Sequence, residues 1–145
     1  SYYEWSYLLF TVPKFNYSYK KQLIGQKKIY TIDSGLAYAN SFSFSKDKGR
    51  ILENTVFLHL RRKYKRIYYH KEKYECDFLI KEREKITKAV QVCYELNEEN
   101  KEREINGLRE AMSKFNLKKG IIITLNQEDQ LGNINVIKAW EFMDI

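Results

Sequence analysis

Residues 75–96 read ECDFLIKEREKITKAVQVCYEL, and this stretch decides the fold. Two apolar-rich runs flank a charged connection over residues 81–85, a pattern that predicts a β-hairpin. Because side chains alternate along a strand, Gln91 and Cys93 are expected on one face of the second run. Asp77 lies in the first run among residues that look buried, and an unpaired buried carboxylate is costly. The hairpin therefore predicts a site in which Asp77 is paired, metal-bound or catalytic.

The composition indicates one folded domain with a small appendage and a basic surface. The 145 residues are 43% hydrophobic and carry a net charge of +7. Such a charge is compatible with nucleic-acid binding and equally with an ordinary lysine-rich surface. The two cysteines have no Cys or His beside them at zinc spacing, which argues against a zinc cluster and suits reduced thiols.

The sequence also predicts the cellular localisation of the protein. No apolar run approaches the roughly 20 residues that span a bilayer, and no signal peptide is visible. We therefore expect a cytoplasmic protein that does not enter the membrane. Because the chain starts at Ser1 rather than at a methionine, we expect a piece of a longer protein or a processed start.

The N-terminal part is predicted to form a separate β-hairpin. A buried strand over residues 5–12 and a returning strand over 27–32 flank a polar, tyrosine-rich connection over 14–25. A short helix over 33–39 and a loop over 40–48 are expected to follow.

From residue 48 onward, the pattern predicts helices and strands around one sheet. A helix over 48–65 has an apolar face that includes Leu52 and Val56, with Glu53 beside it. The other predicted elements are a strand over 67–70, the hairpin, a helix ending at Phe115, strands over 120–125 and 134–137, and a tail helix over 139–143. Because the second helix crosses over between two strands, those strands are expected to be parallel. The result is a mixed sheet with a helix on each face.

Several stretches, taken in order, resemble one family. They are KIYTIDSGL (28–36), GRILEN (49–54), ECDFLI (75–80), QVCYEL (91–96) and KERE (101–104). They resemble the uncharacterised C-terminal domain of a family of prokaryotic AAA-type ATPases. The order helix, three strands, helix, strand resembles the PD-(D/E)XK, or restriction-endonuclease-like, superfamily.

The resemblance implies a fold and a partner. It implies an α/β, restriction-endonuclease-like domain over residues 33–145. It also implies that residues 1–32 are a winged-helix-type β-hairpin, the remnant of a winged-helix region. The implied partner is an ATPase domain elsewhere in the same longer chain, since no GxxxxGK[ST] phosphate loop occurs here.

The chemistry that the resemblance implies is Mg²⁺-assisted cleavage of nucleic acid. Glu53 matches the helix acid and Asp77 the strand acid, and both would hold the metal. The third-strand acid and lysine are replaced by Gln91 and Cys93. Such a lysine is worth roughly 2.7–4 kcal/mol when it stabilises a transition state. The resemblance thus implies a degenerate site, with weak or absent Mg²⁺, in a domain that acts in DNA binding or regulation.

Nearby lysine and arginine residues decide whether another cation could replace the missing lysine of the site. Lys88 is expected on the opposite face from Gln91, and Lys81 is expected roughly 13 Å along the strand from Asp77. Lys101 and Arg103, at the start of the second helix, are predicted to reach back toward the site and to contact nucleic acid.

Each site residue also has a structural alternative. Glu53 could pair with Arg50 or a nearby lysine, and Asp77 with Arg103 or a backbone turn. The polar pair of the third strand could simply face the core. His70 is expected at the surface or at a strand end. Two other functions stay open: an active Mg²⁺-dependent nuclease with an atypical site, and a protein-interaction domain that uses the aromatic N-terminal hairpin.

Overall fold

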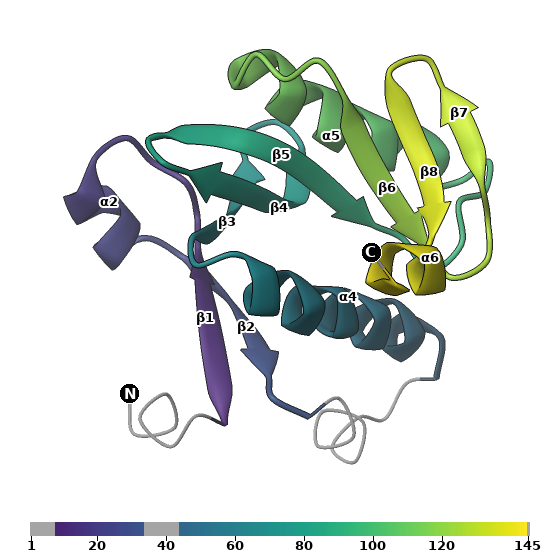
Figure 1. The fold of residues 1–145 in the computed structure, drawn as a ribbon, viewed down its shortest axis with the longest axis horizontal. Helices are drawn as coiled ribbons and strands as arrows, with labels where there is room; N and C mark the ends of the chain where they lie inside the picture. The colour runs from purple at the N-terminus through teal and green to yellow at the C-terminus, as the bar shows by residue number, and fades with distance from the viewer. Residues whose placement is uncertain (1–7, 34–43, 145) are drawn as a thin grey trace.

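The main body of the protein is a six-stranded mixed sheet. Figure 1 shows helices on both faces of this sheet. The computed structural model describes residues 8–33 and 44–144. The sheet has the order β3 (Ile67–Lys71), β4 (Glu75–Glu82), β5 (Lys85–Val92), β6 (Gly120–Thr124), β8 (Ile134–Lys138), β7 (Asp129–Leu131). The strands β3, β4 and β5 are antiparallel neighbours, whereas β5, β6 and β8 run parallel. The α/β class and the parallel pairing across the predicted crossover are therefore confirmed.

The helices divide the core into two layers. On one face, α4 (Phe44–Lys63) packs Val56 and Leu60 against Phe78 and Val90 of the sheet, with α6 (Ala139–Asp144) beside it. On the other face, α5 (Lys101–Lys114) packs residues such as Leu108 into a second cluster. The strand β6 lies in the middle of the sheet, which is why its sequence is apolar almost throughout.

A two-stranded ribbon, formed by β1 (Leu9–Pro13) and β2 (Lys27–Thr31), packs beside α4 (Figure 1). Its inner face carries Val12 and Tyr30, which are buried in the α4-side core. The ring of Tyr30 stacks on that of Phe57 in α4, with centroids 4.3 Å apart. The antiparallel pairing confirms the predicted hairpin for the part of it that lies within the described residues.

Several predicted boundaries differ from the observed ones. The connection of the first hairpin is not a simple polar loop: it contains the helix α2 (Tyr19–Ile24), whose first turn is capped by Ser18. The helix α4 begins four residues before the predicted position 48. The strand β7 was missed because it has only three residues. The short helix predicted over 33–39 lies, apart from its first residue, outside the described residues.

The start of β4 contains an irregularity that matters for the site. Tyr68 pairs with Leu79 but His70 pairs with Cys76, so β4 has one extra residue between these positions. Such a β-bulge breaks the strict alternation of side chains and re-aims one of them. Cys76 and Leu79 therefore both pack on the α5 side, and Asp77, which lies between them, can face the ribbon.

Within the described residues, no helix is long and apolar enough to cross a membrane.

Candidate functional site

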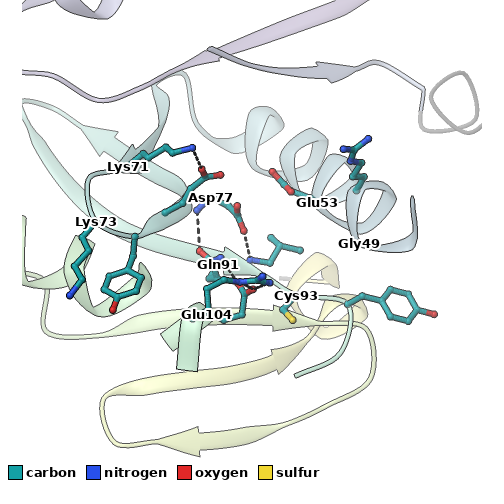
Figure 2. Close-up of a pocket in the computed structure, with 14 residues that line it drawn as sticks. Gly49, Glu53, Lys71, Lys73, Asp77, Gln91, Cys93 and Glu104 are labelled. Atoms are coloured by element: carbon teal, nitrogen blue, oxygen red, sulfur yellow. Dashed lines mark hydrogen bonds and ion pairs between the residues drawn. The ribbon is translucent and has the colours of Figure 1, made fainter. Parts of the chain in front are cut away.

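A cavity of about 700 Å³ opens between α4, the start of β4, the end of β5 and the start of α5 (Figure 2). It brings together five of the predicted site residues, which are Glu53, Asp77, Gln91, Cys93 and Arg103. Lys101 does not line this cavity but two smaller ones of about 330 Å³ each. Figure 2 shows the carboxylates of Glu53 and Asp77 turned toward the same space between α4 and the sheet.

The pocket forms where β4 and β5 separate. Their backbone pairing ends at Phe78 and Val90. Beyond that pair, side chains bridge the strands: Asp77 Oδ2 accepts a hydrogen bond from the Val92 amide at 2.9 Å, and Gln91 Oε1 accepts one from the Asp77 amide at 3.1 Å (Figure 2). The strand β5 then continues alongside β6, and the gap this leaves is the floor of the pocket.

A lysine that the sequence did not point to lies among the acids. The Lys28 ammonium of β2 is 3.1 Å from Glu53 Oε1, 2.8 Å from Asp77 Oδ1 and 2.8 Å from Glu75 Oε1. Glu53 therefore pairs with a lysine, which was one of its predicted structural alternatives. The lysine comes from the N-terminal ribbon. Asp77 pairs with Lys28 and not with Arg103.

The ribbon is held in register by residues next to this cluster. The Asn54 side chain accepts a hydrogen bond from the Thr31 amide at 2.8 Å and donates one to the Thr31 carbonyl at 3.0 Å. The Tyr30 hydroxyl donates to Glu53 Oε1 at 2.6 Å. Lys28 and Tyr30 share the inner face of β2 because they are two residues apart. The clamp on Thr31 therefore fixes where Lys28 reaches the acids.

Burial and charge shift the pKa values of this cluster. Burial of Asp77, reinforced by the nearby Glu53 carboxylate, raises the pKa of Asp77 to about 7 despite the Lys28 ammonium. Burial alone would lower the pKa of Lys28, but Asp77 and Glu53 outweigh it and raise that pKa above its usual range. Burial and Glu53 also raise the pKa of Tyr30, so its hydroxyl remains a donor at neutral pH.

Gln91 is bound on both sides of its amide. Its Nε2 donates to Glu104 Oε2 at 2.5 Å, and Glu104 also pairs with Arg103 at 2.6 Å. Glu104 is buried although its side chain is ionisable, and the sequence analysis missed it. A signal was present: Glu104 precedes Leu108 and Ala111 by four and seven residues, which places it on the apolar face of α5.

Cys93 has a protonated thiol rather than a reactive thiolate. Its Sγ donates to the Glu95 carbonyl at 3.1 Å and accepts a weak contact from Asn100 at 3.5 Å. Burial, with the Glu104 carboxylate nearby, raises the pKa of Cys93 to about 11. The thiol is therefore neutral at physiological pH and cannot supply the charge of the lysine that it replaces.

The surface position predicted for His70 was wrong, whereas the predicted place near a strand end was right, since His70 is the last but one residue of β3. His70 is only 3% exposed, and its Nε2 lies 2.7 Å from Glu110 Oε1 of α5. It thus joins β3 to α5 in the interior, because the helix supplies the polar partner that a buried imidazole requires. Lys81 and Lys88 pair with acids at the opposite end of the β4–β5 hairpin, Glu84 and Glu82.

The residues of the pocket do not fit a Mg²⁺ ion in the observed arrangement. The Lys28 ammonium holds Glu53 and Asp77, and the Gln91 amide oxygen is taken by the Asp77 amide. Among the described residues, only His70, Glu72 and Glu110 bring three potential ligand atoms within 4.8 Å of one another. In this arrangement the Lys28 ammonium takes the place among the acids that a divalent ion would need.

The sequence of this main domain identifies its family. Residues 48–142 match the family described as "Domain of unknown function (DUF4143)". The chain belongs to the DUF4143 family. The matched range begins within α4 and ends within α6, so it contains the pocket acids and leaves out the ribbon that carries Lys28.

A longer relative covers nearly the whole chain. An uncharacterized protein of Methanocaldococcus jannaschii is 47% identical over 159 aligned residues, which include 97% of this chain. The chain spans about a third of that relative's length, 34%. The search of solved structures found no significant match.

The rim of the DUF4143 pocket is basic. Arg50, Lys71, Lys73 and Arg103 line the cavity, and all of them are exposed. They come from α4, the end of β3, the β3–β4 turn and α5, and so surround the pocket acids from several directions. An anionic ligand at the mouth of the pocket would meet positive charge first.

Proposed function

We propose that this DUF4143 chain is a restriction-endonuclease-like domain that binds nucleic acid without cutting it, within a longer protein that contains an AAA-type ATPase. The observation that carries the proposal is the pair of side chains, Gln91 and Cys93, at the third-strand positions of the site. Where a nuclease of this kind needs an acid and a lysine, the pocket has the Gln91 amide, bound on both sides, and the neutral Cys93 thiol. Neither group can hold a metal-bound water or offset developing charge.

The order of elements supports the fold part of this proposal. The chain runs α4, β3, β4, β5, α5, β6, with Glu53 on α4 and Asp77 on β4. These acids, Glu53 and Asp77, converge on one cluster although 24 residues of sequence separate their positions. The ATPase part rests on the resemblance together with the greater length of the relative.

The basic rim supports the nucleic-acid part. Phosphate contacts from exposed lysine and arginine side chains supply most of the affinity of sequence-independent binding. Binding should therefore be weak, salt-dependent and insensitive to sequence. The acids at the floor of the pocket are neutralised in part by Lys28 and Lys71, which reduces their repulsion of a phosphate backbone.

Fluorescence anisotropy with labelled DNA and RNA oligonucleotides at low salt tests this binding. We expect Lys73→Ala to weaken binding several-fold and to lower the salt slope by about one counterion. Lys85→Ala is the matched control, because Lys85 is exposed at the far end of β5 and the charge change is the same. Equal effects of the two variants, or no binding by the wild type at low salt, would contradict the proposal.

A cleavage assay separates this proposal from an active nuclease. Plasmid DNA and RNA incubated with the protein and Mg²⁺ or Mn²⁺ should stay intact. Any cleavage by the preparation should be equally present in Asp77→Asn, since it would come from a contaminant. Cleavage that Asp77→Asn and Glu53→Gln both abolish would establish the alternative, a working nuclease with an atypical site.

A protein-interaction role is a second candidate, and residues 8–32, which comprise the ribbon, its flanks and the α2 connection, carry it. Among the described residues, seven of the eight exposed large hydrophobic side chains lie in residues 8–32: Leu8, Tyr17, Tyr19, Leu23, Ile24, Ile29 and Ile32. Exposed apolar side chains gathered in one region are typical of an interface. Light scattering over a concentration series tests self-association, and a strictly monomeric protein would count against assembly through this surface.

A further inference from the structure

Lys28 has the surroundings of a bound cation rather than those of a surface ion pair. An ammonium has three N–H donors, and Lys28 faces one carboxylate oxygen from each of Glu53, Glu75 and Asp77. The Lys28 side chain is 20% exposed, and that of Asp77 is 9% exposed. Exposed pairs contribute little because water competes for them, but here much of the water has been removed.

The position of Lys28 is imposed by the fold. Asn54 fixes the backbone of Thr31 with two hydrogen bonds, and Tyr30 donates to the same Glu53 oxygen that Lys28 approaches. The Tyr69 ring lies beside the ammonium, with its centroid 5.6 Å from Nζ. Lys28 therefore occupies a prepared place and does not merely rest on the surface.

The cation and its acids come from different parts of the chain. Glu53, Glu75 and Asp77 lie inside the DUF4143 range of residues 48–142, and Lys28 lies outside it. Carboxylate oxygens converging from a helix and a strand are the ligands that divalent ions take in proteins. In this protein, a segment that precedes the family domain supplies an ammonium to them.

We propose that Lys28 is a built-in cation, which binds the pocket acids in place of a divalent metal ion and so fastens the ribbon to the main domain. This inference goes beyond the proposed function and does not depend on nucleic-acid binding. It has two consequences: the folded protein should be indifferent to divalent ions, and removal of the ammonium should leave a set of carboxylates able to bind one.

The test measures Mn²⁺ binding by electron paramagnetic resonance and isothermal titration calorimetry on four proteins. Lys28→Met removes the ammonium and keeps the aliphatic stem, and Lys28→Met with Asp77→Asn also removes a ligand. Lys27→Met is the matched control, because Lys27 is exposed on the opposite face of β2. The wild type is the reference, and the thermal melting of each protein is followed with Mn²⁺ and with a chelator.

We expect the wild type and Lys27→Met to bind Mn²⁺ no better than a surface does, and chelator to leave their melting unchanged. Lys28→Met should bind Mn²⁺ at least about tenfold tighter, with a Kd of about 1 mM or below, and the double variant should lose that gain. If Lys28→Met unfolds, Mn²⁺ should restore its fold. The inference is overturned if Lys28→Met, folded or unfolded, shows no gain in Mn²⁺ binding. It is also overturned if the wild type binds Mn²⁺ as tightly as Lys28→Met does.

Failure of this test and failure of the proposed function are distinguishable. The nucleic-acid proposal is tested on the wild type and on Lys73→Ala without metal ions. The cation inference is tested by metal binding to variants at position 28. Either result can be positive while the other is negative.

Discussion

Gly107 in α5 packs directly against the backbone of β4, and its replacement by alanine gives the sharpest test of how the site is assembled. A Cβ at position 107 would overlap the carbonyl oxygen of Glu75 and lie 3.0 Å from its carbonyl carbon. The obstacle is backbone, so no side-chain rotation can relieve it. The helix or the strand must move, and the strand there carries two of the acids that hold Lys28.

The magnitude follows from two opposing effects. Overpacking of a tight site costs roughly 1–3 kcal/mol, and contact with an immovable backbone belongs at the upper end. Alanine regains roughly 0.8–1.0 kcal/mol of helix propensity over glycine. We therefore expect Gly107→Ala to lower the free energy of unfolding by about 2 kcal/mol, which corresponds to a loss of about 8 °C in Tm for a chain of this size.

Gly49→Ala is the matched control. Gly49 also lies inside a helix, α4, but nothing stands within 4 Å of the Cβ that alanine would add. Only the propensity gain remains, so this variant should be more stable by roughly 0.5–1 kcal/mol. The same chemical change thus has opposite signs at two helical positions.

Urea and thermal unfolding, followed by circular dichroism, measure both variants. The reasoning requires Gly107→Ala to be less stable than the wild type and Gly49→Ala to be at least as stable. A Gly107→Ala protein that melts at or above the wild-type temperature would refute the close approach of α5 to β4.

Three further predictions concern the cluster and the cysteines. Because the pKa of Asp77 in the folded protein is raised to about 7, its proton stabilises the fold at acid pH, and this stability is lost as pH rises toward 7. Relative to Asp77→Asn, the free energy of unfolding of the wild type should fall by about 1.4 kcal/mol per pH unit between about pH 5 and about pH 7. Parallel pH profiles of the two proteins would contradict this prediction. Asn54→Ala should cost roughly 1–3 kcal/mol, since it leaves the Thr31 backbone groups without the side chain that binds them, and hydrogen exchange should show faster opening of β2. Burial raises the pKa of Cys76 and of Cys93, so a thiol reagent at neutral pH should modify both only after unfolding, and rapid modification of the native protein would show that the pocket exposes a thiolate.

Much of the fold could be predicted because long segments with a regular apolar pattern give a clear signal in the sequence. The apolar run at 120–125 and the helix before it were enough to predict a parallel, central β6, since an intervening helix leaves few other connections. The strand β7 could not be found, because three residues at a sheet edge, two of them polar, give no periodic signal. The helix α2 has no buried residue, so it too lacked an apolar face to reveal it.

The site was only half predictable. Glu53 and Asp77 could be paired in advance through the family pattern, and the structure brings them to one cluster. Lys28 could not be predicted as a member of the site, because an alternating strand normally turns its apolar side chains inward. Here Ile29 is 64% exposed, and Lys28 beside it faces the acids. The bulge in β4 also escaped prediction, since one extra residue leaves no mark in the sequence yet changes which way Asp77 points.

The ribbon has a consequence for what counts as a unit in this protein. The DUF4143 range starts at residue 48, so a chain cut there would keep every residue that defines the family. It would also lose the cation that three of its acids share, and it would uncover the Phe57 ring on which Tyr30 stacks. The range that matches the family and the unit that folds therefore have different boundaries, and the folding unit includes the ribbon.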